Sequence, residues 1–434
     1  MIEIDKVLNT ILNDSIELPK VLVQGLTNNS SKVKKGFIFF AYKGDNYDGN
    51  EFIEDAFKNG ACLAISDSNK LESQKNVIKV DDVRTAAGIA CSNFYNFPQN
   101  KVKLIGITGT NGKTSTSTIL KSILDAENEK TLQIGTSGIK PSLEINSGLT
   151  TPDIFDLYEL LNHAVNDGFK NVVLEVSSHA LSQRRIENIS FDITAFTNLS
   201  HDHLDYHKTM EDYFSEKLKL FNLNKENGSS VVIIDDEYGK RISEINSHTK
   251  CISLENKDAD YFCTTYSLSD LGITGTLKWD AKTLDFQSKL IGSFNLENLI
   301  LAAAIAFELN TSKESISEGI KNCTNIDGRL HLVKNKSNQI IFLDYGHTPD
   351  AYLKVLKTLK ENFSRPLKVL FGAGGGRDKS KRPKMAEVVE KYSVECYLAP
   401  DNPRFEDIVS INDDVINGFS KNSHYSFTDR KEAL

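Results

Sequence analysis

The sequence predicts an α/β protein built from three domains, and three observations support this prediction. The chain has 434 residues, whereas a single hydrophobic core stops growing at roughly 250 to 300 residues. Apolar runs of strand length alternate with amphipathic helical stretches, a pattern typical of a mostly parallel sheet flanked by helices. One strand runs through a glycine turn into a helical stretch at residues 105–120. The chain therefore contains several domains, one of them with a parallel sheet and a glycine-rich turn.

The composition excludes several classes of protein. With 39% hydrophobic and 25% charged residues, the chain is an ordinary globular protein and not a disordered one. Its net charge of −8, with acidic and basic residues interspersed, offers no basic stripe, so we expect no nucleic-acid partner. The six cysteines lack metal-ligand spacing and disulfide density, which favours reduced thiols in the cytoplasm. No apolar run approaches the roughly 18 residues of a membrane span, and the N-terminus lacks a signal core.

Three successive blocks of the chain are each predicted to form one domain. Residues 1–98 combine strand-like pieces such as GFIFFAYKG and CLAISD with the helical pattern EFIEDAFKNG, which predicts a small N-terminal α/β domain. Residues 99–326 carry the longest series of apolar runs, from KLIGITG to SVVIID, and predict the central domain with its mostly parallel sheet. Between Asp258 and Leu290 the sequence has an alternating, strand-like pattern, which predicts a small antiparallel excursion there. Residues 327–434 again alternate strand and helix and predict a Rossmann-like C-terminal domain.

The glycine turn of the central domain has the composition of a phosphate-binding P-loop. In such a loop, backbone N–H groups and a helix N-terminus face the anion, a lysine bridges the terminal phosphates, and the next hydroxyl holds Mg²⁺. Ile107 stands where the longer form of the motif has glycine. A ligand-free turn is disfavoured because lysine and threonine directly follow the second glycine. The predicted ATP-binding loop comprises Gly109, Thr110, Asn111, Gly112, Lys113, Thr114 and Ser115.

Two further segments carry candidate metal ligands at predicted strand ends. Glu175 follows the apolar run NVVL, at the carboxyl end of a strand where parallel sheets place their ligands. A lone acid at that position is more often a helix cap. His201, His203 and His207 follow the strand FDITAFTN, but no thiol or second carboxylate has zinc-motif spacing. The pattern therefore favours Mg²⁺-assisted phosphate chemistry over a zinc site.

The motifs of the chain, taken together, resemble those of the Mur ligases, cytoplasmic enzymes that add amino acids to the UDP-linked muramic acid precursor of peptidoglycan. The resemblance covers nearly the whole chain and is closest to the enzymes that add the third amino acid to UDP-N-acetylmuramoyl-L-alanyl-D-glutamate. DNPR at residues 401–404 resembles the form that accepts meso-2,6-diaminopimelate. The motifs occur in this order: TGTNGKTS, Thr150-Thr151-Pro152-Asp153, EVSSH, DHLDYH, GSFNLENLILA, GRLH, DYGHTPD and RDKSKRP.

The resemblance implies an ADP-forming acid–amino-acid ligase. Transfer of the γ-phosphate of ATP to a carboxylate gives an acyl phosphate with a good leaving group, which an amine then attacks. Lys113 and two Mg²⁺ ions stabilise the transferring phosphoryl group. Thr114 and Glu175 are the implied ligands of the first metal, and His203 of the second.

The resemblance also implies a covalent modification of Lys217. In the family, the lysine of the motif Y-x-x-x-K-x-x-L-[FY] is carbamylated by CO₂, and Tyr213, Lys217, Leu220 and Phe221 match that motif. A carbamate would replace a cation that repels Mg²⁺ with an anion that binds it. Spacing alone would favour a solvated lysine in a charged helix.

The remaining site residues follow from the resemblance, which implies three binding regions. In the amino-acid site, the resemblance implies that Arg377 and Arg404 bind the carboxylates of diaminopimelate. It implies that Asp401 and Asn402 bind its ammonium groups. The UDP-sugar residues are Ser30 at the uridine end and Thr150, Thr151, Ser177, Gln183 and Arg185 at the diphosphate and muramoyl part. The further nucleotide contacts are Asn298, Arg329, Asp344 and His347. The amino-acid residues are Arg377, Asp401, Asn402, Pro403 and Arg404.

The chain departs from the family pattern at three places. Asn29-Ser30-Ser31 stands where the family has Asp-Ser-Arg, and His331 stands where it has glutamate. The family also continues beyond the sequence FTDRKEAL through a further strand and a GKGHE-type loop that contacts diaminopimelate, so we expect the C-terminal domain to lack its final segment.

Three alternatives remain open at this stage. The added amino acid could be L-lysine, the chain could be a folylpolyglutamate synthase-like amide ligase, or it could be a non-catalytic nucleotide-binding relative. Release of ADP that depends on both the UDP-sugar dipeptide and an amino acid would fit only the Mur-type ligase. We expect small-molecule substrates and a monomer.

Overall fold

The computed structural model describes residues 1–12, 18–44, 47–68, 76–143, 148–246, 248–336, 339–421 and 424–434. The chain divides into two compact units, each made of several segments. Unit 1 comprises Met1–Gly106, Glu129–Asp192 and Leu223–Gly228, and unit 2 comprises Ile107–Asn128, Ile193–Asn222 and Ser229–Leu434. Both contain parallel strands and helices, so the predicted α/β class is confirmed. No helix in the described part of the chain is long and apolar enough to cross a bilayer.

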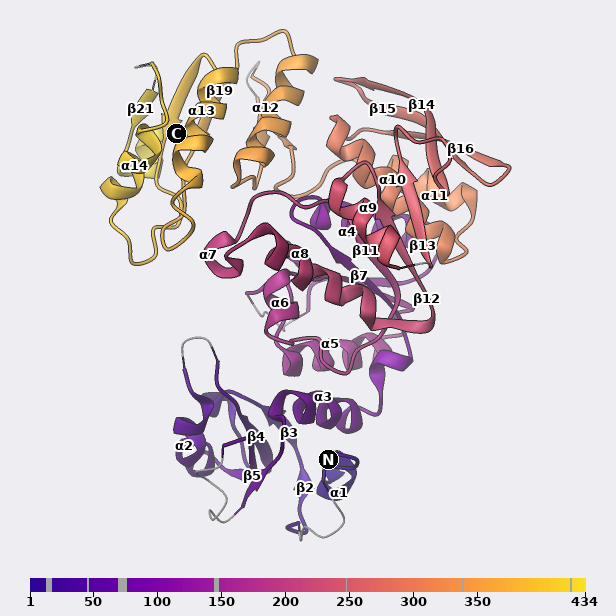
Figure 1. Ribbon diagram of the computed structural model, residues 1–434, viewed down its shortest axis with the longest axis vertical. Coiled ribbons are helices and arrows are strands. Elements are labelled where there is room, and N and C mark those ends of the chain that lie inside the picture. Colours follow the sequence, from indigo (N-terminus) through magenta and orange to yellow (C-terminus); the bar gives the residue numbers. More distant parts are fainter. Residues whose placement is uncertain are drawn as a thin grey trace. The chain divides into compact units, whose positions relative to one another are not determined.

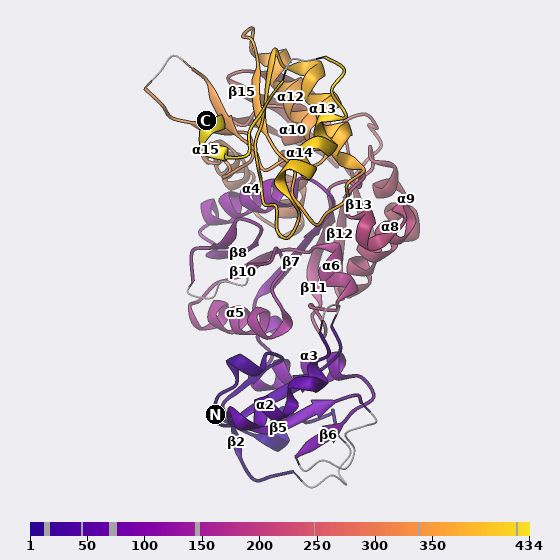
Figure 2. The ribbon, with the colours of Figure 1, turned by 90° about the vertical axis from the view of Figure 1, so that its left-hand side faces the viewer.

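The N-terminal part of unit 1 is a four-stranded parallel sheet in the order β3-β4-β5-β6. Helices α2 and α3 pack against this sheet (Figures 1 and 2). Its core gathers Phe39, Ile53 and Ala64 with other buried apolar residues. The elements are β1 (Ile2–Glu3), α1 (Ile4–Val7), β2 (Leu22–Val23), β3 (Gly25–Thr27), β4 (Phe37–Ala41), α2 (Ile53–Lys58), β5 (Ala61–Ser66), β6 (Val77–Lys79) and α3 (Val83–Phe94).

The second part of unit 1 contains two helices, α5 and α6, that each begin at a polar N-cap residue. Strand β10 runs parallel to β8, and β9 returns antiparallel to β8. Asp153 caps α5 by accepting a hydrogen bond from the Phe155 amide, and Ser177 caps α6 through the Ala180 amide. The elements are β8 (Thr131–Gly135), β9 (Gly138–Lys140), α5 (Ile154–Asn166), β10 (Asn171–Glu175) and α6 (Ser178–Ser182).

Unit 2 is organised around α4, the helix that the glycine loop opens. Strand β7 leads from unit 1 into this loop, and α10 and α11 pack against α4. Eleven side chains of α10 are buried, and nine of them are apolar; the two polar ones are Asn295 and Asn298. The elements are β7 (Lys103–Thr108), α4 (Lys113–Ala126), β11 (Phe191–Phe196), α7 (Leu204–His207), α8 (Met210–Leu218), α10 (Ser293–Glu308) and α11 (Lys313–Asn322).

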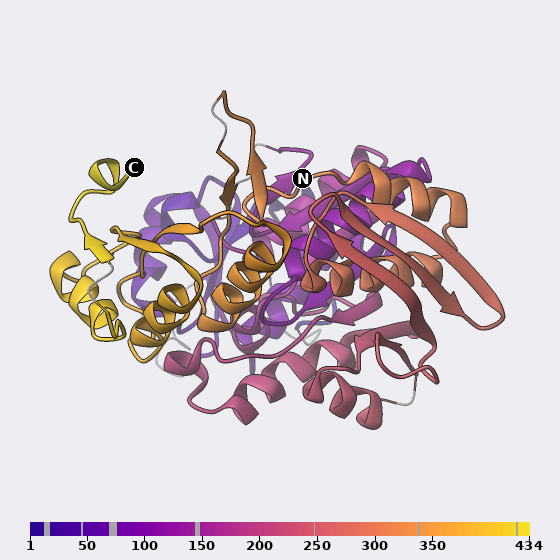
Figure 3. The same ribbon diagram turned by 90° about the horizontal axis from the view of Figure 1, so that it is seen from above.

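The predicted antiparallel excursion is confirmed. Strands β12, β13 and β14 pair in parallel, after which β14, β15 and β16 pair antiparallel. Figure 3 shows these last strands as long curved ribbons in salmon, and α11 packs against β16. The elements are β12 (Asn224–Ile233), α9 (Glu237–Ile245), β13 (Thr249–Ser253), β14 (Tyr261–Ser269), β15 (Gly272–Trp279) and β16 (Lys282–Ser288).

The C-terminal part of unit 2 carries a parallel sheet in the order β19-β20-β21. Its core of Phe371, Met385, Leu398 and other apolar residues lies between this sheet and α12 to α14. Figure 1 shows α12 in orange and the elements after it in yellow. The elements are β17 (His331–Val333), β18 (Ile341–Leu343), α12 (Pro349–Asn362), β19 (Lys368–Phe371), α13 (Lys381–Tyr392), β20 (Glu395–Leu398), α14 (Ile408–Ile416), β21 (His424–Ser426) and α15 (Arg430–Ala433).

Candidate active site

The glycine loop joins the end of β7 to the first turn of α4. Gly109 and Gly112 have φ angles of 143° and 90°, which favour glycine because a side chain would be strained there. A Cβ on Gly112 would also lie 2.4 Å from the side-chain oxygen of Asn298. Lys113 Nζ donates to the carbonyls of Gly109 (2.8 Å) and Thr110 (2.9 Å). The loop is therefore a tight turn of the main chain, and the Lys113 side chain folds back onto it.

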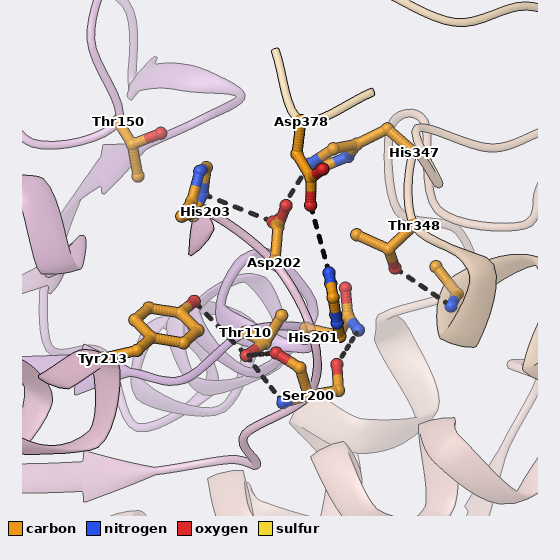
Figure 4. Close-up of polar contacts among 12 residues, drawn as sticks. Thr110, Thr150, Ser200, His201, Asp202, His203, Tyr213, His347, Thr348 and Asp378 are labelled. Carbon is orange, nitrogen blue, oxygen red and sulfur yellow. Dashed lines mark hydrogen bonds and ion pairs between the residues drawn. The ribbon is translucent and has the colours of Figure 1, made fainter. Parts of the chain in front are cut away.

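The segment that follows β11 braces this loop. Thr197 Oγ1 donates to the Asn111 carbonyl (2.6 Å), and the Asn198 side chain accepts from the Asn111 amide (3.1 Å). The Ser200 amide donates to Thr110 Oγ1 (3.0 Å), a contact drawn in Figure 4. Thr197, Asn198 and Ser200 were not predicted as site residues. Their signal was their position directly after a buried strand, β11.

A pocket of about 530 Å³ lies beside the loop in unit 2. Arg329 donates from Nη2 to Thr114 Oγ1 (3.3 Å) and so connects the pocket wall to the start of α4. Burial raises the pKa of the Asp344 carboxyl, which accepts from the amides of Leu330 and Gly346. Six of the predicted nucleotide residues line the pocket: Asn111, Gly112, Ser115, Asn298, Arg329 and Asp344. The prediction missed the lining residues Asn198, Phe294, Glu297, Gly346, Ala351, Lys354 and Val355.

Asp202 forms a charged cluster near the glycine loop. Its carboxylate lies 3.3 Å from His203, 3.5 Å from His347 and 3.4 Å from Lys381, and Figure 4 shows it between the two histidines. Burial alone would raise the pKa of Asp202, but its contacts with His347, His203 and Lys381 outweigh burial and hold that pKa well below its usual range. The predicted His347 thus belongs to this cluster and is not among the pocket-lining residues.

The three histidines predicted as a group face different partners. His201 Nε2 lies 3.0 Å from Asp378, His203 contacts Asp202, and the ring of His207 stacks on Tyr213. Among the described residues, no group of three or more histidine, cysteine or acidic side chains is arranged to hold a metal ion.

Lys217 is buried in α8, with 1% of its surface exposed. Its Nζ donates to the Gly109 carbonyl (2.9 Å) and lies 4.5 Å from the centre of the Tyr213 ring. Burial, reinforced by the nearby charge of Lys113, lowers the pKa of the amine well below its usual range. The interpretation as a solvated lysine is wrong, because the hydrophobic face of α8 turns this side chain toward the glycine loop.

Within unit 1, four predicted residues lie together at the C-terminal end of β10: Thr150, Thr151, Glu175 and Ser177. Thr151 Oγ1 donates to the Glu175 carbonyl (2.8 Å) and accepts from the Ser177 amide (3.0 Å). Thr136 Oγ1 donates to the Glu175 carboxylate (3.0 Å) and lies 3.1 Å from Thr150 Oγ1. Glu175 ends its strand as predicted, and its carboxylate is held by a hydroxyl.

A second pocket, of about 210 Å³, lies in unit 1. Arg185 donates to the Thr151 carbonyl (3.1 Å) and to the side chain of Gln183. Ser30 does not line this pocket, and its carbonyl accepts from Asn59 Nδ2 (2.9 Å). Two predicted residues, Gln183 and Arg185, line the pocket together with the unpredicted Tyr42, Arg84, Ala87, Asp153, Ile154 and Arg184.

The DNPR segment packs against the glycine-rich loop after β19. The Gly375 amide donates to the Asn402 carbonyl (2.9 Å), and Arg404 donates from Nη1 to the Gly375 carbonyl. The Arg404 amide donates to Asn402 Oδ1 (3.3 Å), and the residue has a φ of 52°. Arg377 follows the same glycine loop and is exposed, and Asp401 and Pro403 flank Asn402. The prediction missed buried Arg382, which holds the carboxylate of Glu406.

Comparisons with known proteins show three matches to family models. Residues 22–95 match the Mur ligase family catalytic domain, residues 107–306 the Mur ligase middle domain, and residues 328–434 the Mur ligase glutamate ligase domain. A UDP-N-acetylmuramoyl-L-alanyl-D-glutamate–2,6-diaminopimelate ligase of Aquifex aeolicus is 40% identical over 95% of this chain and 85% of its own length. A ligase of the same name from Caldanaerobacter subterraneus is 39% identical over 96% of this chain and 86% of its own length.

Solved structures show the same similarity. The structure of a ligase with that name has a TM-score of 0.73 and 29% identity, and the match covers 100% of this chain and 89% of the other. The folylpolyglutamate synthase of Mycobacterium tuberculosis, solved with ADP, has a TM-score of 0.68 at 16% identity over 81% of this chain and 86% of its own. At that identity the second match shows a shared fold only.

Proposed function

The chain belongs to the Mur ligase family, and from this premise we propose that it joins 2,6-diaminopimelate to UDP-N-acetylmuramoyl-L-alanyl-D-glutamate with release of ADP. Ligases of this family form amide bonds at the expense of ATP. The observation that carries the proposal is the glycine loop that opens α4 beside a pocket lined by Asn298 and Arg329. The names of the relatives supply the substrates.

We assign the pocket beside the glycine loop to ATP. Main-chain amides of the loop and the N-terminus of α4 are suited to the phosphates. Lys113, which now donates to two loop carbonyls, can exchange them for phosphate oxygens and stabilise charge on the transferring phosphoryl group. The carboxylate of the dipeptide becomes an acyl phosphate, and the amine of diaminopimelate displaces phosphate to form the amide bond.

The donor set also fits Mg²⁺, which prefers oxygen ligands. Thr114 offers a buried hydroxyl at the start of α4, and Glu175 offers a carboxylate that Thr136 orients. In unit 2 we propose Thr114, His203 and Lys217 as metal-binding residues. In unit 1 we propose Glu175 as a metal-binding residue. A bound Mg²⁺ would supply positive charge to the phosphates during transfer.

The environment of Lys217 supports its carbamylation. Only an unprotonated amine can attack CO₂, and the lowered pKa of Lys217 favours that form. The carbamate would place an anionic oxygen group next to the Gly109 carbonyl, where the amine now donates. We therefore propose Lys217 as a modified residue that contributes oxygen to the metal site.

The other predicted residues take the roles that the family resemblance implies. We propose that Ser30, Thr150, Thr151, Ser177, Gln183 and Arg185 bind the UDP-sugar, and that Arg377, Asp401, Asn402, Pro403 and Arg404 bind diaminopimelate. The domain limits 1–98, 99–326 and 327–434 remain our proposal, and the three family matches support it. We also propose that the reaction takes place in the cytoplasm and that the enzyme is a monomer.

An amino-acid panel in an ADP-release assay tests the proposal. Diaminopimelate should be preferred over L-lysine, because lysine lacks the distal carboxylate that we assign to Arg404. Arg404→Asn should raise the KM for diaminopimelate by about 10- to 100-fold, since a charge-assisted hydrogen bond contributes roughly 1.5 to 3 kcal/mol. Asparagine tolerates the positive φ of 52° at this position. Equal use of both amino acids would refute the substrate assignment, and ADP release without either substrate would refute the ligase.

A further inference from the structure

Arg84 lies on the first turn of α3 and connects two segments that line one pocket of unit 1. Its Nη1 donates to the Gln183 carbonyl (2.7 Å), and its Nη2 donates to the Lys43 carbonyl (3.2 Å). The guanidinium also stacks on the Tyr42 ring, 4.2 Å from its centre. One side chain therefore ties the segment just after β4 to the turn that carries Gln183 and Arg185.

The start of α3 fixes this side chain in place. Asp82 caps the helix by accepting hydrogen bonds from the amides of Arg84 (2.9 Å) and Thr85 (3.1 Å). The same carboxylate also pairs with Arg184 at 2.5 Å. The cap, the first turn of α3 and the wall of the pocket are thus parts of one hydrogen-bonded arrangement.

The arginines of this pocket differ in how their charge is balanced. Arg184 is paired with two carboxylates, Asp82 and Glu187. The partners of Arg84 are two neutral carbonyl oxygens and an aromatic ring, and no carboxylate among the described residues lies within ion-pair distance of it. Asp153 also lines the pocket, where its side chain accepts hydrogen bonds from Asn28 Nδ2 (3.3 Å) and the Phe155 amide (3.4 Å). Arg84 therefore brings to the pocket a guanidinium that is not paired with a carboxylate.

We propose that Arg84 binds the diphosphate of the nucleotide sugar and holds the two walls of its pocket in register. This inference rests on the proposed function and extends it, since the UDP-sugar residues deduced from the sequence do not include Arg84. A guanidinium suits this role because its planar fork can donate to two walls while its charge attracts a phosphate. An ammonium also has several donors, but they radiate from one nitrogen and lack the planar fork of the guanidinium.

Calorimetric titration of the full chain with UDP, with UDP-N-acetylmuramoyl-L-alanyl-D-glutamate and with ATP tests this proposal. Arg84→Ala should weaken binding of both uridine ligands at least tenfold and change ATP binding less than twofold. Arg84→Lys, which keeps the charge but not the fork, should lose less. In steady-state assays the KM for the nucleotide sugar should rise by the same factor, with kcat changed less than threefold.

Lys130→Ala provides a matched control. Lys130 also stacks on an aromatic ring, that of Phe169 at 4.2 Å, and donates to a backbone carbonyl, that of Asp167 at 2.8 Å. It belongs to the same unit but does not line the pocket. This variant should bind all three ligands like the wild type.

The outcomes separate this inference from the proposed function. Unchanged binding of both uridine ligands by Arg84→Ala, or an equal loss of ATP binding, would overturn the role of Arg84 alone. A loss for the full nucleotide sugar without a loss for UDP would overturn the assignment to the diphosphate. A wild-type chain that binds ATP but no uridine ligand would overturn the proposed function, and this inference with it.

Discussion

The glycine loop and the Arg84 pocket are built in opposite ways. The loop consists of consecutive residues, Gly109 to Ser115, whose main chain forms the site and whose lysine bonds back to it. The pocket takes its lining side chains from four separate segments, represented by Tyr42, Arg84, Asp153 and Arg185. A site made of main chain is encoded locally in the sequence, whereas a pocket made of side chains is encoded by the fold.

The two sites also distribute positive charge differently. Two lysines lie at the glycine loop, the motif residue Lys113 and the distant Lys217. Burial lowers the pKa of Lys217, so Lys113 is the residue to which we assign the charge at the loop. In the pocket, three arginines line one small volume. We therefore expect single substitutions to abolish the reaction at the loop and to weaken binding by degrees in the pocket.

The largest effect is expected for Lys113→Ala. Loss of the charge that meets the transferring phosphoryl group should lower kcat by about a thousandfold or more. The fold should persist, since the two carbonyls to which this lysine donates belong to its own loop. ADP release with all substrates present measures the first expectation and the melting temperature the second. Turnover close to that of the wild type would show that the loop does not hold phosphate.

Lys217→Ala should come next, with a loss of about a hundredfold in kcat, the upper range for loss of a group that supports a metal site. Added short-chain carboxylates should restore part of the activity by filling the space of the carbamate. Intact-mass spectrometry under CO₂ should detect the modification in the wild type only. An active wild-type enzyme whose lysine is found unmodified would contradict the carbamate.

Arg185→Ala should have an intermediate effect on binding. The arginine donates to the Thr151 carbonyl and to Gln183, and its removal should raise the KM for the nucleotide sugar by about tenfold, as expected for one charged hydrogen bond. The kcat should change little, because Arg84 and Arg184 remain in the pocket. A fall in kcat with an unchanged KM would show that this pocket residue supports the reaction step and not binding. The expected difference between the pocket and the glycine loop would then be wrong.

The sequence predicted the parts of the structure that depend on neighbouring residues. The α/β class, the antiparallel strands between Asp258 and Leu290 and the glycine loop follow from local patterns, and the structure confirms them. Arg84 could not be found in this way, because its two acceptors lie 41 and 99 residues away along the chain. The burial of Lys217 was equally hidden, since the segment EDYFSEKLKLF carries four other charged residues and looks solvated in isolation.

The smallest effect is expected for Lys217→Met, and it concerns the stability of the protein and not its activity. Lys217→Met replaces a buried amine with an apolar chain of similar length, and the Gly109 carbonyl keeps Lys113 as a donor at 2.8 Å. In the unfolded chain the amine has a pKa of about 10.4, and in the folded chain its pKa is far lower. At a pH between these two pKa values, the unfolded chain binds one more proton at this amine than the folded chain does. The amine therefore lowers the free energy of unfolding of the wild type at pH 7, and this loss shrinks as the pH rises toward 10.

The methionine variant has no such group, so it should be more stable than the wild type at pH 7, by about 1 kcal/mol, a common gain when a functional residue is replaced by one that suits its surroundings. The difference should narrow at pH 10. Melting temperatures of both proteins in CO₂-free buffer at the two pH values measure it, with Lys130→Met as the control for an exposed lysine. A variant that melts below the wild type at both pH values would show that the amine of Lys217 stabilises the fold, and that the glycine loop, like the Arg84 pocket, depends on a distant cation for its shape.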